Sequence, residues 1–580
     1  MSQELSDTHI RRERDSQDMP TLLRVQSAVP FLLLLALSQS PADRIEFKLG
    51  RFQEIALFEN KTFAVFLSNI PEDVTFVIIQ VHTKYVNTLL SSYKIPAGET
   101  STTGQDPALL LSLKPEENAT IWHLQTLTEN VSAMSVILPY KARDPIPGGC
   151  RVASDSMVDA SVHLQYNLYE ATISFAPANV GYARGVVPPL CDFADEEPTL
   201  RLQYDVYQFF LPETDLTEKV LFASLQKMAK VEQVEANGVK LFSLSAQDKT
   251  SVTVSSIPGQ GVIYNVIVKD PKMNTSAAYT PAHTYGCSFT EKLDNCYTLK
   301  RTSTRIFLVS VGLVGLFICF FGHRYLKTEL FFFGFILVGF VSFVLLTQRS
   351  TLHYDVILGL VVVLGSVGGS LLVMCWWRSG SVAFCVLVAG LLLGFLLSSL
   401  IFFTPLANVK VFNDDAVFWV TFISVALLVP LIFFSCPRPL NILACGFVGS
   451  YAVILAIHNF VFTSLAYITL NIVKRALHGE FKAAFVNVPF QMNDYVLISV
   501  WVVLLVSGIV FQFCHEKEQP RFPPHPYKTW KRDRERRQTN VLDPSHHIPP
   551  IRDRMKSALT DVKHLFTKQQ PAGEQTPLLL

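Results

Sequence analysis

The chain has 580 residues, of which 49% are hydrophobic, 12% aromatic and 17% charged, and its mean hydropathy is +0.31. A soluble globular chain carries about 25% charged residues, so this deficit indicates a protein that contacts lipid. The 49 Lys and Arg residues balance 48 Asp and Glu residues, which excludes a general basic field for nucleic acid. The 28 glycines follow no period, which excludes a collagen-like chain. Composition therefore predicts a membrane protein with a sizeable soluble part.

Residues 1–38 are predicted to be a secretory signal peptide with an N-terminal extension. Residues 28–37 form an apolar run too short to span a bilayer, Arg24 precedes it, and small residues follow up to Ser38. The polar stretch ahead of the run is long for a signal peptide. A start at Met19 would give one of ordinary length, so the sequence leaves the start at Met1 or Met19 open.

The region that follows reads as a β-rich ectodomain of sandwich-like type. A stretch rich in Pro and Gly divides it into two predicted subdomains, residues 39–147 and 148–302. The run 74–81 predicts a buried strand, and the stretch 253–268 predicts strands that the turn formers of residues 258–261 interrupt. We therefore expect two β subdomains before the first membrane span.

Two shorter patterns refine this prediction. Segments 164–170 and 202–208 resemble each other and alternate with period two, which predicts equivalent or neighbouring strands. Residues 216–231 predict a helix that Asp215 and Glu218 would cap. The apolar face of that helix would carry Leu221, Leu225 and Met228.

Four N-x-S/T sequons precede the first apolar span and none follows it. They place predicted N-glycans on Asn60, Asn118, Asn130 and Asn274. A single sequon is weak evidence, but four on one side indicate a lumenal or extracellular domain.

The same region holds an even set of cysteines, which predicts disulfides in an oxidising compartment. The set consists of Cys150, Cys191, Cys287 and Cys296. Four cysteines allow three connectivities, and the sequence does not decide among them. We favour pairs between the first two and between the last two, because each closes a local loop.

Residues 303–513 are predicted to form a seven-pass transmembrane domain, since each apolar run approaches the roughly 20 residues that cross a bilayer. The runs are 306–321, 330–347, 356–377, 382–403, 416–435, one within 440–473, and 495–513. The sixth is ambiguous, because it could hold one span with a re-entrant piece or two short spans. As drawn, no run contains Asp, Glu, Lys or Arg, and this counts against a secondary transporter.

The distribution of basic residues predicts the orientation. Odd-numbered loops carry Arg324, Lys327, Arg378 and Arg438, which by the positive-inside rule are cytoplasmic. The sixth loop disagrees, since it places Lys474, Arg475 and Lys482 on the predicted outside. Together with the sequons, seven spans predict a cell-membrane protein with an extracellular N-terminus and a cytoplasmic C-terminus.

Residues 514–580 are predicted to be a cytoplasmic basic tail. A cluster that would lie against anionic lipid, at about 1 kcal/mol per basic residue, comprises Lys531, Arg532, Arg534, Arg536 and Arg537. At the end of the tail, Glu574, Leu578 and Leu579 match an acidic dileucine signal. Such a signal would bind a clathrin adaptor and support endolysosomal cycling. The alternative is an inert, polar chain end.

The sequence offers no catalytic, cofactor or metal site. No Cys-x-x-Cys or His pair occurs at ligand spacing. Tyr354 and Asp355 match half of an intramembrane aspartyl protease dyad, but the GxGD partner is missing. The third span ends without an Asp-Arg-Tyr switch, which counts against a G-protein-coupled receptor. Small-residue pairs at Gly365/Gly369 and Gly390/Gly394 predict helix packing, with homo-oligomerisation as the alternative.

Several long strings resemble the transmembrane 7 superfamily member 3 family. They are RDPIPGGC (143–150), FAPANVGYARGV (175–186), LQYDVYQFFLPETDLTE (202–218), GQGVIYNVIV (259–268), CFFGHRYLKTELFF (319–332) and RFPPHPYKTWKRDRERR (521–537). The resemblance covers the chain from about residue 44 onward. It implies a seven-pass plasma-membrane glycoprotein associated with cell survival and the attenuation of protein-folding stress. No catalytic or ligand-contact residue comes with it.

The predicted protein is thus a membrane protein with an N-terminal β-sandwich-rich ectodomain and a seven-helix transmembrane bundle. Its predicted function is non-enzymatic, with the ectodomain as a sensing or binding module for an unknown ligand. The alternative is a channel or transporter formed by the bundle. The expected partners are the lipid bilayer, N-glycans and the adaptor, with no cofactor and no nucleic acid.

Overall fold

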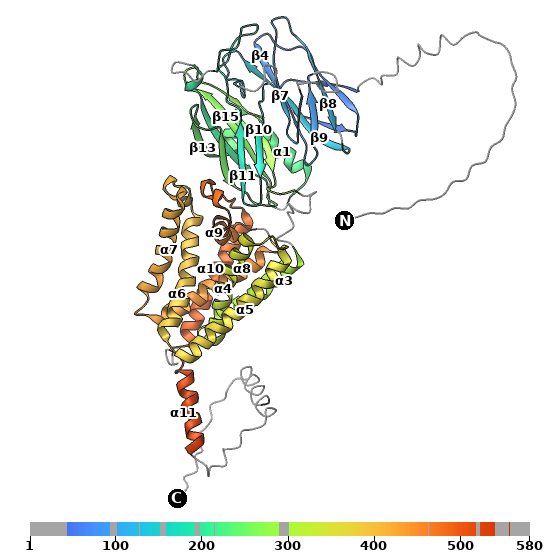
Figure 1. The fold of residues 1–580 in the computed structure, drawn as a ribbon. Helices are drawn as coiled ribbons and strands as arrows, with labels where there is room; N and C mark the ends of the chain where they lie inside the picture. The colour runs from blue at the N-terminus through green and yellow to red at the C-terminus, as the bar shows by residue number, and fades with distance from the viewer. Residues whose placement is uncertain are drawn as a thin grey trace, which may run out of the picture.

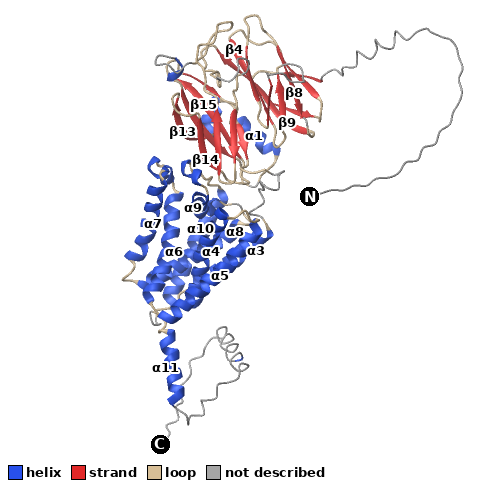
Figure 2. Ribbon diagram, viewed as in Figure 1, coloured by secondary structure: helices blue, strands red, loops and turns tan. Residues whose placement is uncertain are grey.

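In the computed structural model, a β region stands at one end of a bundle of long helices, and α11 extends from the other end (Figure 1). Strands and long helices belong to separate parts of the chain (Figure 2). This arrangement confirms the predicted fold class. The structure describes residues 43–92, 101–126, 128–150, 158–191, 198–213, 215–288, 301–461, 463–517, 522–539 and 556.

The first β domain is built from two sheets, with strand orders β1-β3-β8-β5-β6 and β2-β9-β4-β7. Strand β1 runs parallel to β3, and the other pairings are antiparallel. Its strands are β1 (Asp43–Phe47), β2 (Gln53–Leu57), β3 (Thr62–Leu67), β4 (Val74–His82), β5 (Thr88–Ser91), β6 (Ser101–Gly104), β7 (Ala108–Ser112), β8 (Thr120–Thr126) and β9 (Val131–Lys141). The core between the sheets includes Val65, Leu124 and the fully buried Trp122.

The second β domain also has two sheets, β10-β11-β14 and β13-β12-β15-β16, with β17 paired to β15. Its elements are β10 (Val162–Tyr166), β11 (Glu170–Phe175), η1 (Pro198–Arg201), β12 (Gln203–Phe210), α1 (Glu218–Lys227), α2 (Val231–Asn237), β13 (Val239–Ser245), β14 (Ser251–Ser255), β15 (Val262–Asp270), β16 (Thr275–Ala278) and β17 (Ala282–Thr284). As the turn formers of residues 258–261 predict, the stretch 253–268 is divided between β14 and β15, and Gly259 adopts φ +84° in the turn between them.

Two finer predictions for this domain need correction. Segments 164–170 and 202–208 contribute β10 and β12, which lie in different sheets, so the alternative that they are neighbouring strands was wrong. Helix α1 begins at Glu218 with Thr217 as its N-cap, so Asp215 is not the cap. Instead, Asp215 accepts hydrogen bonds from the backbone N–H and hydroxyl of Thr217. The predicted apolar face is buried, with Leu221, Leu225 and Met228 each 0% exposed.

Strand β4 is buried along its whole length because both of its faces are covered. Val77 and Ile79 point into the core of the first domain. Phe76 and Ile78, which alternate with them, belong to a second core that also contains Tyr264 of β15. The two β domains therefore share apolar packing through the outer face of β4 rather than meeting across a solvated linker.

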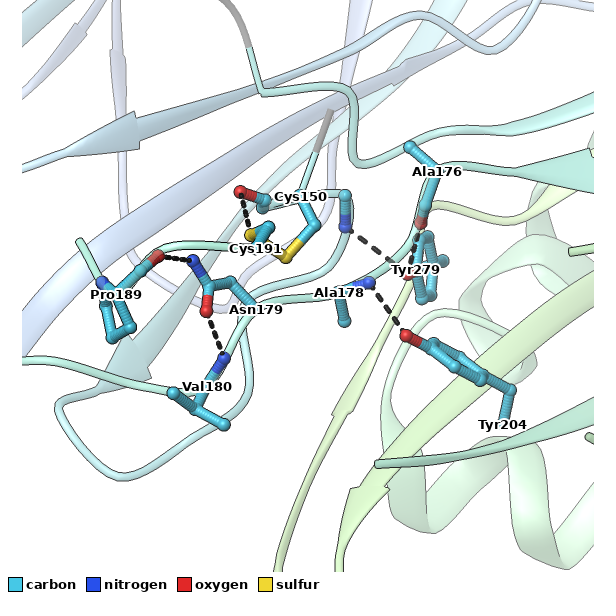
Figure 3. Close-up of a disulfide and its surroundings, with 11 residues drawn as sticks. Cys150, Ala176, Ala178, Asn179, Val180, Pro189, Cys191, Tyr204 and Tyr279 are labelled. Carbon is cyan, nitrogen blue, oxygen red and sulfur yellow. Dashed lines mark hydrogen bonds between the residues drawn. A yellow bond between two sulfur atoms is a disulfide. The ribbon is translucent and has the colours of Figure 1, made fainter. Parts of the chain in front are cut away.

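A disulfide between Cys150 and Cys191 closes the start of the second domain, with a Cα–Cα distance of 5.4 Å (Figure 3). Beside it, the hydroxyl of Tyr279 donates to the Ala176 carbonyl at 2.6 Å and accepts from the backbone N–H of Gly148 at 3.3 Å. This pairing confirms the first predicted disulfide. Cys287 is also disulfide-bonded. Its predicted partner, Cys296, lies outside the described residues, so that pair stays a prediction.

Glycine is required where the chain enters this domain. Gly148 has φ +70°, and a Cβ added there would lie 1.8 Å from the carbonyl oxygen of Asp159. Any side chain at this position would therefore displace the backbone beside the disulfide, which explains why residue 148 is a glycine.

Seven described helices are long and apolar enough to cross a membrane. They are α3 (Thr302–Phe321), α4 (Leu326–Arg349), α5 (Tyr354–Ser379), α6 (Val382–Phe403), α7 (Asp415–Ile432), α8 (Pro437–His458) and α10 (Met492–His515). The 3₁₀ turns η3 (Pro405–Asn408) and η4 (Lys410–Asn413) precede α7, and α11 (Pro526–Thr539) follows the bundle. The ambiguous sixth region resolves into the span α8 and the separate helix α9 (Tyr467–Leu477), whose 11 residues are too few to cross.

The predicted small-residue pairs pack within the bundle. A Cβ at Gly369 would lie 2.5 Å from the carbonyl oxygen of Phe331 on α4, and one at Gly394 would lie 2.1 Å from that of Ala426 on α7. Both pairs therefore allow close approach between helices of the same chain. Gly365 and Gly390 face the same neighbouring helices.

The expectation that no span holds an ionisable side chain was wrong. Helix α4 begins at Leu326, before the apolar run that starts at residue 330, and so includes Glu329. This side chain is 0% exposed. The prediction failed because the helix extends beyond the apolar run used to draw the span.

Candidate functional site at the junction of the β region and the bundle

A segment that we call the docking loop, residues 463–491, joins α8 to α10. It contains η5 (Ser464–Ala466), α9 and η6 (Gly479–Ala483), followed by an extended stretch. Helix α9 lies at the end of the bundle that faces the β region (Figure 1). The loop therefore occupies the place where a change in one region could reach the other.

The docking loop extends a sheet of the second β domain. The backbone N–H of Phe485 donates to the Thr253 carbonyl, and the N–H of Ser255 donates to the Phe485 carbonyl, each at 2.9 Å. These bonds form a parallel bridge to β14, which is an edge of its sheet. The Phe485 ring packs edge-on against Phe242 at 4.9 Å between centroids. An otherwise unpaired strand edge is thus covered by a segment of the membrane domain.

A buried lysine stabilises the same contact. Lys474 is 7% exposed, and its ammonium donates to the hydroxyl of Ser255 and to the carbonyl of Ser256. It also lies 5.0 Å from the centroid of the Tyr467 ring. Burial without a carboxylate partner among the described residues lowers the pKa of Lys474 to about 7.

A second polar contact joins the end of β12 to the start of α10. The side chain of Asn493 donates to Glu213 at 2.7 Å. The backbone N–H of Glu213 donates to Gln491 at 2.8 Å, and Gln491 donates to the Leu211 carbonyl at 3.2 Å. Burial, together with the nearby charge of Asp494, raises the pKa of Glu213 to about 7.

Capping explains why α10 begins where it does. Gln491 and Asp494 form a capping box, in which each side chain bonds to the backbone of the other residue. Asp494 also accepts from the backbone N–H of Ser464 at 2.6 Å, and this bond attaches the start of the docking loop to the same helix end. The contacts of Glu213 are thereby anchored to a rigid helix.

The basic residues that contradicted the charge rule have structural roles here. Lys474 is buried against the β region, and Arg475 pairs with Asp415 at 3.0 Å while lying 3.8 Å from the centroid of the Phe418 ring. The third residue, Lys482, is exposed. Two of the three charges therefore serve packing and docking, and the charge rule does not apply to them.

A further polar cluster lies between the two β domains. Asp106 contacts His82 at 2.7 Å and His283 at 2.8 Å, and it accepts from the backbone N–H of His283 at 2.9 Å. Burial opposes the charged form of Asp106, but the charges and hydrogen bonds of the two histidines hold its pKa well below its usual range. Burial also opposes the charged form of His283, yet Asp106 raises the pKa of that imidazole.

The four predicted glycosylation sites are all exposed, and they comprise Asn60, Asn118, Asn130 and Asn274. Asn60 and Asn274 have positive φ, as in tight turns. The amide oxygen of Asn130 accepts from the backbone N–H of Glu59, which positions two of the sequons at one corner of the first domain. Each of these asparagines is therefore placed where a glycan could be attached.

The predicted tail sites are described only in part. On α11 the side chains of Lys531, Arg532, Arg534 and Arg536 are exposed. The Arg537 side chain and the dileucine residues Glu574, Leu578 and Leu579 lie outside the described residues, as does the predicted signal peptide.

Helix α11 is stacked on the end of α5. The Tyr527 ring lies 5.5 Å from that of Trp377 and 4.2 Å from the guanidinium of Arg378. Trp530 packs on the same side, 6.2 Å from Trp377. Aromatic and cation–π contacts thus hold the exposed basic helix at the end of the bundle.

Within the described part of the chain, no group of three His, Cys, Asp or Glu side chains is arranged to hold a metal ion. The candidate site is a contact surface built from strand pairing at Phe485 and from the hydrogen bonds of Lys474 and Glu213.

Comparison with known proteins agrees with this architecture. Family models match residues 43–140 (TM7SF3-like, N-terminal immunoglobulin-like domain), 145–290 (TM7SF3-like, second immunoglobulin-like domain) and 308–513 (TM7S3/TM198-like domain). Transmembrane 7 superfamily member 3 of Mus musculus is 54% identical over 538 residues, which are 92% of this chain and 95% of that protein. The chain belongs to the transmembrane 7 superfamily member 3 family. The Homo sapiens member is 53% identical over 92% of this chain and 94% of its own length.

Solved structures add little to the family assignment. A β-glucuronidase of Bacteroides uniformis is 10% identical, covers 43% of this chain and 32% of its own, and has a TM-score of 0.17. A likeness of this size supports no inference. Membership of the transmembrane 7 superfamily member 3 family rests on the sequence matches, which confirm the resemblance that the long strings indicated.

Sequence reasoning did not find the docking loop. Its clearest signal is the group of basic residues on the predicted outside, Lys474, Arg475 and Lys482, which disagrees with the positive-inside rule. Strand pairing at Phe485 uses backbone groups and leaves no side-chain pattern. Lys474 belongs to no motif, and the family string 202–218 that contains Glu213 carries no pattern that predicts burial, so the burial of both residues becomes visible only in the folded chain.

Proposed function

We propose that this chain is a non-enzymatic, multi-pass glycoprotein of the cell membrane whose β region senses or binds a ligand. The docking loop would pass the state of the β region to the bundle. The observation that carries this proposal is the pairing of Phe485 with β14, because it makes a segment between two spans part of a sheet in the β region. The family resemblance supports a role in cell survival and in attenuating protein-folding stress.

The proposed orientation places the β region outside the cell and the tail in the cytoplasm. Four exposed asparagines in sequons and the basic odd-numbered loops support it. Glycosidase treatment of the full-length protein should increase its gel mobility, and a tag after Leu580 should be stained only in permeabilised cells. Staining of that tag on intact cells would contradict the orientation. We extend the proposal to adaptor binding at the dileucine and to endolysosomal cycling.

The coupling role can be tested by removing one backbone donor. Phe485→Pro eliminates the hydrogen bond to Thr253, whereas Phe485→Leu keeps it and retains an apolar side chain. Cells that lack the endogenous protein would receive each variant, with surface amounts matched by biotinylation, and would be exposed to dithiothreitol. We expect survival to be restored by the wild type and the Leu variant and not by the Pro variant. Full rescue by the Pro variant would contradict coupling through the docking loop.

A channel or transporter formed by the bundle is a second candidate, and the buried Glu329 on α4 is the observation that favours it. Ionisable groups inside a bundle commonly mark ion or proton pathways. Currents or solute flux through the purified, reconstituted protein that depend on Glu329 would support this function. The absence of any current or solute flux through the reconstituted protein, at all voltages and ion gradients, would count against it.

A further inference from the structure

The bundle contains a second buried polar cluster at the end from which the tail leaves. Its side chains come from three helices and one turn. Glu329 lies on α4, Asn441 on α8 and Gln512 on α10, and His323 lies in the turn that follows α3. None of these side chains is more than 5% exposed. The cluster is remote from the docking loop, which lies at the other end of the bundle, so it is independent of the site described above.

Hydrogen bonds fix the geometry of the cluster. The Asn441 amide nitrogen lies 2.8 Å from Oε2 of Glu329 and 3.1 Å from Nδ1 of His323. Gln512 donates to the Cys319 carbonyl at 2.7 Å and accepts from the backbone N–H of His323 at 3.3 Å. One amide therefore holds the Glu329 carboxyl and the His323 ring together, while the other connects α10 to the end of α3.

The carboxyl of Glu329 is incompletely satisfied. Oε2 accepts a hydrogen bond from the neutral amide of Asn441, and the thiol of Cys445 is a further, weak donor to the carboxyl. Oε1 lacks an N–H or O–H donor among the described residues. No described Lys or Arg lies within ion-pair distance, and Lys327 on the same helix is exposed. An ionised carboxylate buried in this way costs several kcal/mol unless a cation or several donors compensate it.

The groups that face Glu329 from the neighbouring helices are neutral or weakly acidic. Asn441 and the thiol of Cys445 come from α8, and the thiol of Cys385 comes from α6. From the α3 side the cluster includes the His323 ring and the Cys319 thiol, and α10 contributes the amide of Gln512. On the α5 side the neighbour is the apolar Trp376. These neighbours provide too few oxygen ligands for a metal cation, but a proton needs none beyond the Glu329 carboxyl itself.

We propose that Glu329 is a proton-binding site within the bundle, held by Asn441 and accessible from the side of the C-terminal tail. Gln512, which accepts from the backbone N–H of His323, lies beside Arg324, His515 and Glu516 at the tail end of the bundle, where Arg324 and His515 are exposed. When the proton is bound, the carboxyl is neutral and fits the apolar packing of α4, α6 and α8. When the proton leaves, the uncompensated charge loosens that packing, so the bundle responds to pH on the tail side.

Infrared difference spectroscopy of the full-length protein in lipid nanodiscs tests this directly. Spectra recorded from acid to alkaline pH should contain a carbonyl band of a protonated carboxylic acid that disappears on titration and shifts in D₂O. Glu329→Gln should remove the band, and Glu329→Asp should move it. Glu535→Gln, which removes an exposed glutamate on α11, is the matched control and should leave it unchanged.

The outcomes separate the proposal from a purely structural role. A titrating band that is lost only in Glu329→Gln supports the site. A spectrum that is the same in the wild type and Glu329→Gln, or a Glu329 band that never titrates, overturns it. If the Gln variant does not fold, a shifted band in Glu329→Asp gives the same assignment, and an unshifted band overturns it. Because no step involves the β region, failure here leaves the proposed sensing function untouched.

Discussion

The two junctions in this molecule are built from opposite chemistry. Between the β domains, β4 places Phe76 and Ile78 in a core shared with β15, so the contact is mainly apolar. Between the β region and the bundle, the contact relies on strand pairing at Phe485 and on the buried polar groups of Lys474 and Glu213. We expect the first junction to couple the unfolding of the two domains, because they share a core. The second can be weakened while each side keeps its own core.

The polar junction is also expected to depend on pH in two separate windows. Glu213 has a pKa raised from 4.5 to about 7, so its contribution to docking is complete below 4.5 and is lost as pH rises through about 7. Lys474 has a pKa lowered from 10.5 to about 7, so the docked form binds fewer protons than the free form between these values. Docking therefore strengthens as pH rises from about 7 to 10.5, and it should be weakest near neutral pH.

The largest effect is expected at the apolar junction. Ile78→Ala should lower the free energy of unfolding by about 2–5 kcal/mol, as is usual for a buried Ile or Leu. Because Ile78 packs on the second domain, hydrogen exchange in the full-length protein should show reduced protection in β15 as well as in β4. Ile79→Ala is the matched control, since its side chain lies in the core of the first domain alone. Unchanged protection in β15 for the Ile78 variant would show that the shared core does not couple the domains.

A smaller effect is expected from the Asp106 cluster within the same junction. Asp106→Asn should cost about 1.5–3 kcal/mol, the range for hydrogen bonds to a charged group. In the wild type the contribution of His283 is complete below its ordinary pKa of 6.5 and is lost as pH rises through its higher folded value. The variant should lose this pH dependence, as measured by urea unfolding at several pH values.

The control for that measurement is Asp159→Asn, which removes a partially exposed Asp–His pair inside the second domain. We expect it to change the pH dependence little, because exposed pairs contribute at most about 1 kcal/mol. Equal effects of the two substitutions would mean that burial between the domains gives Asp106 no special role.

At the polar junction, Lys474→Met should remove the increase in docking strength above about pH 7. It should not change the weakening of docking between about pH 4.5 and about pH 7, which is assigned to Glu213. The measurement is the exchange rate of the Phe485 and Ser255 amides, corrected for the intrinsic rate at each pH. Lys482→Met changes an exposed lysine of the same loop and serves as the control. If docking still strengthens above about pH 7 in the Lys474 variant, a group other than Lys474 is responsible.

The smallest effect is expected for Glu213→Gln, because this side chain is only partly buried. The variant should remove the weakening of docking between about pH 4.5 and about pH 7 while preserving the contacts of the backbone with Gln491. Glu218→Gln, an exposed substitution in the first turn of α1, is the comparison. If docking still weakens between about pH 4.5 and about pH 7 in the Glu213 variant, Glu213 is not the group responsible.

Much of the fold could be predicted from the sequence, because hydrophobic runs report directly on burial. The seven spans and the all-buried strand β4 follow from such runs, whereas the Cys150–Cys191 pair was favoured by its short loop without being decided by the sequence. The candidate site could not be predicted, because strand pairing by Phe485 is a backbone interaction between segments more than 200 residues apart. Glu329 was missed because apolar runs mark where a span is hydrophobic, while helix hydrogen bonding decides where it begins.

The shared core also sets an order of events during synthesis. When β9 is complete, the outer face of β4 is still uncovered, and its partner β15 follows about 130 residues later. At about 5–20 residues synthesised per second, the outer face of β4 would stay exposed for roughly 6–26 s before β15 is made. The edge of β14 stays unpaired for longer, since Phe485 follows it by about 230 residues and the six spans α3 to α8 lie between them. During synthesis the chain therefore exposes first an apolar sheet face and then an unpaired strand edge, and both features favour aggregation until their partners are made.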